Sequence, residues 1–281
     1  MINKPLVSVV MPAYNHENFI KEAIESVLCQ TYKNREIIII DDGSTDKTPE
    51  IINNYANKYI NEIRYYRQVN MGAHNAINNG IDKAKGDYIS IINSDDIYTN
   101  DRIETLLDSL QTSDSSLAFS DVEFIDDTGN ILNEQNDFVR EIRKKINSLH
   151  NYPTLGYALL HSNIAVSTGN FLFTKKLYVF VGGFKRYKYC HDWAFILNSL
   201  KFTIPIFIKK KLYNYRVHKG NTFSKLEHLA DQETNSILRD FLNFSVRLTV
   251  APNSNFPCPA NHTKDFDSYI KSFGYQFINQ Q

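Results

Sequence analysis

Residues 36–44 read Glu-Ile-Ile-Ile-Ile-Asp-Asp-Gly-Ser, a short apolar run that ends in two carboxylates, a glycine and a serine. Four consecutive isoleucines predict a strand that is buried on both faces, as in a parallel sheet covered by helices. The Asp41-Asp42-Gly43 sequence predicts a turn where that strand ends. The stretch therefore predicts an α/β fold in which acidic side chains follow a buried strand.

Comparable units lie on both sides of this strand, and short β-branched runs alternate with amphipathic segments. Such alternation predicts βαβ units and a mostly parallel central sheet flanked by helices. We expect strands at 6–11, 63–67, 88–92, 117–124 and 131–132, with helices at 19–28, 45–56 and 73–85. Beyond residue 160 the periodicity is weaker, and we expect strands at 170–173 and 204–208 and helices at 193–200 and 227–248.

The chain has 31 Lys and Arg and 31 Asp and Glu, but these charges are unevenly distributed. Residues 1–139 contain 11 basic against 23 acidic side chains, whereas residues 140–211 contain 13 against 2. The basic segment, residues 140–211, is either an ordinary solvated surface or a face toward an anionic partner, such as phospholipid or a phosphate-bearing acceptor. Nucleic acid is not expected, because no arginine-rich or aromatic RNA-binding signature accompanies the charge.

Cysteine usage and hydropathy predict a cytoplasmic protein. Cys29, Cys190 and Cys258 are widely spaced and odd in number, which favours a reducing compartment over a disulfide framework. The first apolar run is too short for a signal-peptide core, and no run approaches the roughly 20 apolar residues of a membrane span. We expect a soluble chain that lies, at most, peripherally on the inner face of the cell membrane.

Polar side chains follow three of the expected strands. The strand ends are Pro12-Ala13-Tyr14-Asn15, Asp41-Asp42-Gly43-Ser44 and Asn93-Ser94-Asp95-Asp96. Carboxyl ends of parallel strands share one edge of the sheet, where ligands bind. Each group alone also fits a turn, a helix cap or a core-edge aromatic. Together they predict clustered carboxylates that need a compensating cation, and oxygen ligands point to Mg²⁺ or Mn²⁺.

A series of motifs follows in order along the chain, from about residue 5 to residue 224. The motifs are Val7–Asn15, Ile40–Asp46, Asn70–Asn75, Ala84–Ile89, Thr168–Phe171 with Val181–Phe184, His191–Trp193, and Tyr215–His218 with Asn221-Thr222. The series resembles the inverting family 2 glycosyltransferases, which have the GT-A fold. That resemblance implies a metal-dependent, hexosyltransferase-type enzyme that uses a nucleotide-diphosphate sugar, with a UDP-sugar as the default donor.

The resemblance also implies a role for each matching residue. Donor binding is assigned to Pro12, Ala13, Tyr14, Asp42, Asn75, Asn93 and Asp95, and metal binding to Asp95, Asp96 and His218. Asp192 is assigned as the catalytic base, and acceptor contacts are assigned to Gly169, Asn170 and Trp193. Core packing for Trp193 and a structural role for His218 remain alternatives.

Three residues depart from the family's usual sequence. Asn93 stands where an Asp is usual, His74 where an Arg is usual, and His191 where a Glu is usual. These changes affect the expected metal affinity, the fixed charge beside the donor, and the surroundings of Asp192. They also leave room for a rival interpretation, a sugar-nucleotide-binding protein without catalysis.

The resemblance divides the chain into a GT-A domain at 1–225 and a helical extension at 226–281. Within the domain, residues 1 to about 115 form the nucleotide-sugar half and residues 116–225 the acceptor half. We expect the extension to pack or to support a homo-oligomer rather than to lie in a membrane, because its polar face is not basic. A second rival, a nucleotidyltransferase, needs a glycine- and arginine-rich phosphate loop that residues 12–15 lack. The expected acceptor is a carbohydrate or lipid-linked oligosaccharide of surface polysaccharide synthesis.

Overall fold

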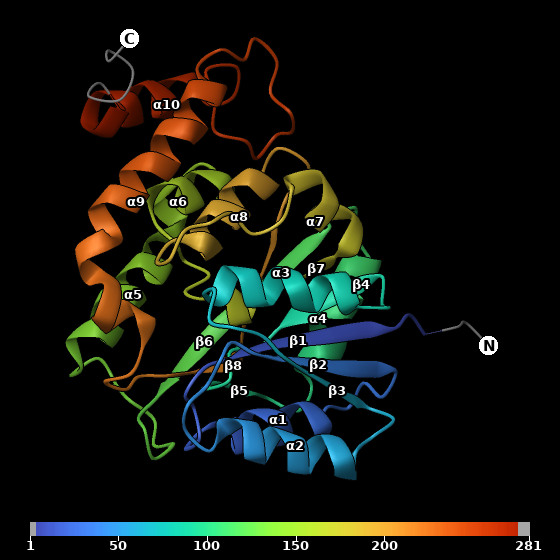
Figure 1. The fold of residues 1–281 in the computed structure, drawn as a ribbon. Helices are drawn as coiled ribbons and strands as arrows, with labels where there is room; N and C mark the ends of the chain where they lie inside the picture. Colours follow the sequence, from blue (N-terminus) through green and yellow to red (C-terminus); the bar gives the residue numbers. More distant parts are fainter. Residues whose placement is uncertain (1–3, 275–281) are drawn as a thin grey trace.

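The computed structural model describes residues 4–274, without the side chains of 222–225, 227, 273 and 274. Within that part of the chain, helices cover an eight-stranded sheet with the order β3-β2-β1-β4-β7-β6-β8-β5 (Figure 1). The strands are β1 (Val7–Ala13), β2 (Arg35–Asp41), β3 (Ile63–Arg67), β4 (Tyr88–Ile91), β5 (Ile97–Tyr98), β6 (Leu117–Ile125), β7 (Leu172–Thr174) and β8 (Ile206–Arg216).

Helices separate most of the strands, as the alternating sequence predicts. The α-helices are α1 (Ile20–Leu28), α2 (Thr48–Lys58), α3 (Ala73–Lys83), α4 (Arg102–Gln111), α5 (Asp137–Asn147), α6 (Leu155–His161), α7 (Lys175–Val181), α8 (His191–Ser199), α9 (Thr222–Ser245) and α10 (Thr263–Tyr269). Short helical turns are η1 (Ser148–Asn151), η2 (Thr168–Asn170) and η3 (Ile270–Gly274).

The first four strands in spatial order, β3, β2, β1 and β4, are parallel. The isoleucines of β2 alternate between the two faces of the sheet: Ile38 and Ile40 belong to one buried cluster, and Ile37 and Ile39 to the other. This confirms the prediction of a strand buried on both faces. Each cluster is completed by helices, α3 on one side and α1 with α4 on the other (Figure 1).

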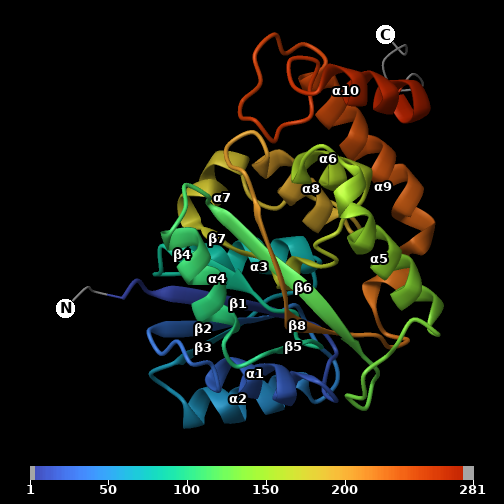
Figure 2. The same ribbon diagram turned by 180° about the vertical axis from the view of Figure 1, so that it is seen from behind.

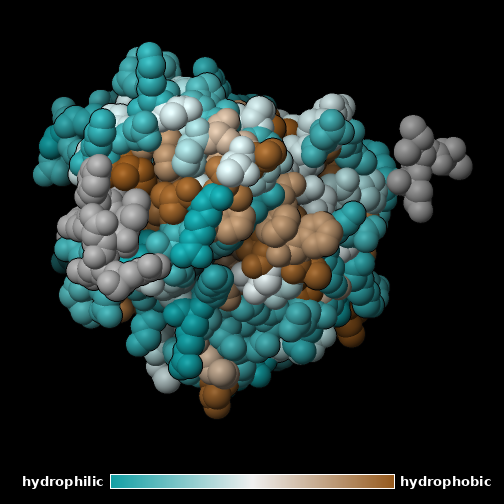
Figure 3. Space-filling model, turned by 90° about the horizontal axis from the view of Figure 1, so that it is seen from above, coloured by the Kyte–Doolittle hydropathy of each residue, from teal (hydrophilic) through white to brown (hydrophobic). Residues whose placement is uncertain are grey.

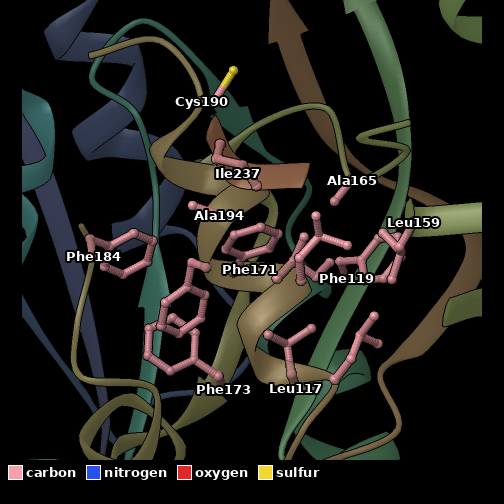
Figure 4. Close-up of a cluster of buried hydrophobic side chains, with 14 of the residues drawn as sticks. Leu117, Phe119, Leu159, Ala165, Phe171, Phe173, Phe184, Cys190, Ala194 and Ile237 are labelled. Atoms are coloured by element: carbon pink, nitrogen blue, oxygen red, sulfur yellow. The ribbon is translucent and has the colours of Figure 1, made fainter. Parts of the chain in front are cut away.

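The second half joins the sheet through β7, which is antiparallel to both β4 and β6. Phe171 and Phe173 pack with Phe184 and Ala194, and Ile237 of α9 reaches the same cluster (Figure 4). The predicted helix at 227–248 is therefore α9, and it packs into the main core. On the far side of the molecule, β6 runs beside β8 (Figure 2).

Two expected strands differ from those observed. Residues 131–132 contribute only an isolated bridge between Ile131 and Ile125. The strand expected at 204–208 continues as β8 through residue 216, because it pairs with β6 on both sides of a bulge at Lys209 and Lys210. None of the described helices is both long and apolar enough to span a bilayer.

Candidate functional site

The carboxyl ends of β1, β2 and β4 lie beside one another because these strands are parallel neighbours. Ala13 at the end of β1 is in register with Asp41 at the end of β2. The Asp42 N–H donates to the Ala13 carbonyl over 2.8 Å, which ties the two ends together. Pro12 is half-buried, whereas Tyr14 is 45% exposed and presents its ring on this rim.

Asp42 is buried, and its carboxylate holds the loop that leads into α3. Asp42 Oδ1 accepts from the Met71 N–H over 2.8 Å and from Gln68 Nε2 over 2.7 Å. Asp42 Oδ2 accepts from the Gly72 N–H over 2.8 Å, and Gly72 has a φ of 88°. A carboxylate oxygen can accept two bonds, so Oδ2 keeps one acceptor position for a ligand.

An open surface depression lies near this carboxylate. It is lined by Gly43, Arg67, Gln68, Val69 and Asn70. Asn75, in the first turn of α3, accepts from Gln68 Nε2 over 3.0 Å and so fixes one wall of the depression. Asp42 and Asn75 do not line the depression themselves, but both accept from the Gln68 side chain that does.

Three side chains that are far apart in sequence converge at the edge of the sheet, beyond the carboxyl end of β4. Asp95 Oδ2 lies 3.1 Å from His218 Nε2 and 3.8 Å from His16 Nε2. One ligand atom from each residue lies within 4.8 Å of the others. Burial raises the pKa of the Asp95 carboxyl, but His16 and His218 outweigh it, and the pKa is lowered overall.

This trio fits a divalent cation. Two imidazole nitrogens and one carboxylate oxygen suit Mn²⁺ better than Mg²⁺, which proteins bind mainly through oxygen. His16 was not among the sequence-predicted ligands. The only indication of His16 in the sequence is its position, because it directly follows Tyr14-Asn15 at the end of the first expected strand.

Asp96 occupies a different place from Asp95. It is buried, and its carboxylate accepts from the Tyr213 hydroxyl over 2.5 Å, the Arg216 N–H over 2.7 Å and Asn93 Nδ2 over 3.0 Å. Burial and the neighbouring Asp95 raise the pKa of Asp96 well above its usual value. Asp96 lies outside the group of His16, Asp95 and His218, and its buried carboxylate already accepts three hydrogen bonds from the protein, so this position does not support the predicted metal role.

Asn93 links the rim to the acceptor half of the chain. Its Nδ2 donates to Ser167 Oγ over 2.7 Å as well as to Asp96. Ser167 precedes η2, whose Gly169 approaches so closely that a Cβ there would lie 2.9 Å from the Asn93 nitrogen and 1.9 Å from Tyr213 Oη. Only glycine allows η2 to lie against the end of β4 in this way.

Asp192 lies in the first turn of α8 and is partly exposed. Its Oδ2 accepts from Asn163 Nδ2 over 2.8 Å, and its Oδ1 accepts from the Trp193 N–H over 2.7 Å. Burial raises the pKa of Asp192 to about 6, although both hydrogen bonds act to lower it. A carboxylate with this pKa is ionised at neutral pH and is a better base than an ordinary aspartate.

The two histidines that depart from the family's usual sequence are both buried. His191 Nε2 lies 3.0 Å from Thr168 Oγ1, which joins α8 to η2. Burial, with His74 as the next cause, lowers the pKa of His191 to about 4. The pKa of His74 is lowered by burial and by Arg186. Both imidazoles are therefore neutral at pH 7. His74 thus lacks the positive charge of the usual arginine, and His191 lacks the negative charge of the usual glutamate.

The residues predicted for acceptor binding have different surroundings. Asn170 is fully buried, and its amide bonds the backbone of Ser120 and Ala165, so no polar atom remains for an acceptor. Trp193 is partly exposed, but its Nε1 donates to the Leu159 carbonyl over 2.7 Å. A stacking role for Trp193 stays a prediction, whereas the prediction for Asn170 does not fit its position.

Sequence reasoning missed Glu233 on α9. Its carboxylate accepts from three successive N–H groups, those of Lys188, Tyr189 and Cys190, over 2.9, 2.8 and 3.0 Å. These residues form the loop that leads directly into α8. Glu233 therefore fixes the approach to Asp192 from a helix that carries no motif.

Sequence and structure comparisons identify the family and the fold of this chain. The profile of glycosyl transferase family 2 matches residues 8–180. An uncharacterized glycosyltransferase of Rickettsia typhi is 35% identical over 222 residues, which cover 78% of this chain and 66% of that protein. An uncharacterized glycosyltransferase of Haemophilus influenzae is 41% identical over 129 residues, which cover 46% and 52%. The chain thus spans two-thirds or less of the length of these relatives.

The fold also resembles solved transferases. The crystal structure of S. aureus TarS 1–349 has a TM-score of 0.65 at 17% identity and covers 96% of this chain and 73% of that one. The mannosyltransferase PcManGT from Pyrobaculum calidifontis, in complex with GDP-Man and Mn²⁺, has a TM-score of 0.65 at 16% identity and covers 99% and 71%. This likeness shows the GT-A fold, and the profile covers more than half of the chain, so the chain belongs to glycosyl transferase family 2.

Proposed function

We propose that the chain is an inverting glycosyltransferase that moves a sugar from a nucleoside-diphosphate donor to an acceptor hydroxyl. One observation carries the proposal: a lone, partly exposed carboxylate, Asp192, is connected through His191, η2 and Asn93 to the rim that holds Asp95. In a single displacement, the base and the leaving diphosphate lie on opposite sides of the sugar carbon. Asp192 takes the proton of the attacking hydroxyl, a contribution of roughly 10²–10⁴-fold in rate.

On the donor side, Asp95, His16 and His218 would hold Mn²⁺ or, less favourably, Mg²⁺. Bound there, the cation supplies positive charge to the departing diphosphate. Asp96 is not part of this ligand set, and its role is to fix Asn93, Tyr213 and the Arg216 backbone. Tyr14 would contact the face of the base, and the free position on Asp42 Oδ2 would accept from a base N–H.

A UDP-hexose is the donor we expect. Support comes from two proteins of the same fold, because TarS has been solved in complex with UDP-GlcNAc and PcManGT in complex with GDP-Man. A base N–H beside a carboxylate acceptor is available in both uracil and guanine, so the sugar nucleotide is identified only by experiment.

The acceptor we propose is a carbohydrate or a lipid-linked oligosaccharide of surface polysaccharide synthesis, glycosylated in the cytoplasm. The basic segment, residues 140–211, supports an acceptor that carries phosphate. In this proposal residues 1 to about 115 bind the donor, residues 116–225 bind the acceptor, and α9 of the 226–281 extension braces the base through Glu233.

The test is a screen of UDP- and GDP-sugars for release of nucleoside diphosphate, with and without Mn²⁺. Asp192→Asn should bind donor normally by calorimetry and lose transfer by roughly 10²–10⁴-fold. Asp95→Ala should lose Mn²⁺-dependent donor binding as well. Asp114→Asn, an exposed carboxylate in the loop between α4 and β6, is the control and should behave as wild type.

The same screen separates the two rival functions. A binding protein without catalysis would bind a donor and release no nucleoside diphosphate with any acceptor. A nucleotidyltransferase would consume a nucleoside triphosphate and release pyrophosphate. Equal transfer rates for wild type and Asp192→Asn would remove the base assignment.

A further inference from the structure

Most cations of the basic segment fall into two groups in the structure. In the first group each cation pairs with a carboxylate of the acidic first half. Arg143 Nη1 lies 2.7 Å from Asp121, and Lys211 Nζ lies 2.8 Å from Glu123. These pairs lie on α5 and β8, and they neutralise that side of the molecule.

The second group lies on and around α7 and α8. Among residues 4–274, no carboxylate lies within ion-pair distance of its members, Lys176, Lys185, Arg186, Lys188 and Lys201. Burial and the neighbouring Lys185 lower the pKa of Lys201, although Asp240 acts to raise it. The excess positive charge of residues 140–211 is therefore concentrated at this end of the molecule.

Exposed apolar side chains lie among these cations. Val179 is 66% exposed, Phe180 54% and Phe202 50%. The rings of Phe180 and Phe202 are 5.7 Å apart, so the patch is continuous from α7 to the turn after α8. Lys176 and Phe180 are four residues apart and share one side of α7.

Lysines lie over the rims of this patch. Lys176 Nζ is 5.5 Å from the Phe180 ring, and Lys201 Nζ is 4.4 Å from the ring of Phe244 on α9. We name this surface the α7 face, and it consists of Lys176, Val179, Phe180, Lys201, Phe202 and Phe244. Figure 3 shows apolar residues gathered on the upper side of the molecule with long hydrophilic side chains beside them.

Single exposed apolar residues are ordinary, but a continuous aromatic patch bordered by unpaired lysines fits a particular partner. Aromatic and aliphatic side chains enter the boundary between lipid headgroups and acyl chains, while lysine ammonium groups remain at the phosphates. A second copy of the chain fits poorly, since two α7 faces would bring like charges together.

We propose that the α7 face docks on the surface of an anionic phospholipid bilayer. The proposal deepens the proposed function and rests on it only for the lipid-linked acceptor. α7 contacts α8, and Phe184 in the loop between them stacks on Phe195 of α8, with ring centroids 4.2 Å apart. Asp192 lies in the first turn of α8 and Phe202 lies just beyond its other end, so one short helix links the base to the docked face.

The experiment is co-sedimentation of the full chain with vesicles of phosphatidylcholine alone or mixed with phosphatidylglycerol. The wild type should bind the mixed vesicles, and added salt should weaken binding because surface charges are screened. Lys176→Gln with Lys201→Gln should lower the partition coefficient about 25-fold, or about fivefold for each lysine. Phe180→Ser with Phe202→Ser should lower binding at every salt concentration.

The matched control lies on the opposite side of the sheet, at the end of α2. Lys58 Nζ lies 5.2 Å from the Tyr59 ring, and Ile60 is 74% exposed. This site therefore has a lysine, an aromatic ring and an exposed apolar side chain, as the α7 face does, but no continuous aromatic patch. Lys58→Gln with Ile60→Ser should bind as wild type does. Circular dichroism and thermal unfolding of each variant separate lost docking from lost folding.

Three outcomes overturn the proposal: no binding of the wild type to mixed vesicles, equal binding by folded α7-face variants, or a concentration-dependent dimer that the Phe180→Ser change abolishes without vesicles. Release of nucleoside diphosphate from free donor is measured in parallel. Vesicle binding without release of nucleoside diphosphate would reject the proposed function and support membrane docking. Release of nucleoside diphosphate without vesicle binding would support the proposed function and reject membrane docking.

Discussion

The ionised carboxylate of Asp192 is partly buried, and this lowers the stability of the folded chain at neutral pH. Its pKa, raised to about 6 from an ordinary 3.8, means that the folded chain binds this proton more tightly than the unfolded chain. Stability from this group is therefore complete below the ordinary pKa and is lost as pH rises through about 6. The pKa of Asp95 is instead lowered, because its pairing with His16 and His218 favours the ionised carboxylate.

Removing the Asp192 charge should stabilise the protein. We expect Asp192→Asn to raise the free energy of unfolding at pH 7 by about 1–2 kcal/mol, and the gain should disappear at low pH, where the wild-type side chain is protonated. Asn163 Oδ1 has no partner among the described residues, so a flipped Asn163 amide can accept from the new amide. Urea unfolding at several pH values checks this, and a loss of stability at pH 7 would contradict it.

The same pKa predicts how transfer depends on pH. A protonated carboxyl cannot accept the proton of the attacking hydroxyl, so kcat/KM should fall tenfold for each unit of pH below about 6. Initial rates across this range, at saturating Mn²⁺, give the inflection. An inflection near the ordinary carboxyl pKa, or none, would show that the buried Asp192 environment does not control the rate.

Glu233 acts on Asp192 through the loop before α8, so it is a positioning residue. Glu233→Gln leaves one carbonyl oxygen for three N–H donors and removes a charge that helps to raise the pKa of Asp192. We expect kcat to fall, the donor KM to stay constant, and the inflection of the pH profile to move lower. Asp231→Asn on the exposed part of α9 is the control. A purely structural role would leave the inflection unchanged.

Among the elements, α3 lies unusually close to the sheet. A Cβ at Gly80 would lie 2.4 Å from Val10 Cγ1 and 3.3 Å from Ile40 Cγ1, so only glycine permits this packing. Gly80→Ala should destabilise the fold by about 1–3 kcal/mol although alanine is the better helix former. Asn54→Ala on exposed α2 should stabilise it slightly. Equal urea midpoints for the wild type and Gly80→Ala would show that α3 moves away at no cost.

The elements that were predicted from sequence share a physical property. β1 to β4 each combine an apolar run with a turn signal, so local sequence determines them. In α5 the few apolar side chains, with Val139 and Ile146 buried, lie among charged residues, and the helix forms because it packs on the sheet. Residues 209–211 of β8 are all lysine, and pairing with β6 on both sides of a bulge at Lys209 and Lys210 keeps this stretch extended. Tertiary pairing therefore determines the middle of β8, whereas Phe138, Val139, Ile142 and Ile146 have the helical spacing that indicates α5 and that the sequence prediction left unused.

At the scale of the whole molecule, the site residues also differ in whether a sequence motif identifies them. Asp42, Asp95 and Asp192 stand in motifs and could be predicted from them. His16 and Glu233 act through residues far away in sequence, so no local signal identified them. Asp96 and Asn170 also stand in motifs, but buried polar partners from distant segments determine what they do.

Arg216 joins several parts of the molecule and should be essential for stability. It is buried, donates to the Asp95 carbonyl over 2.8 Å, and reaches Glu22 on α1 over 2.5 Å. Arg216→Lys cannot reproduce this fork of donors, and we expect a loss of about 3–5 kcal/mol in unfolding free energy. Arg140→Lys, in an exposed pair with Asp137, should change it by less than about 1 kcal/mol. Similar unfolding midpoints for both variants would refute this role.

The trio of His16, Asp95 and His218 draws on the beginning, the middle and the later part of the chain. A ribosome makes these residues in that order, so the third side chain arrives only after most of the polypeptide has been translated. A partly synthesised chain therefore lacks the complete trio, and with it the proposed cation site. Under the proposed function, turnover would begin only after residue 218 has been translated and β8 has joined the sheet.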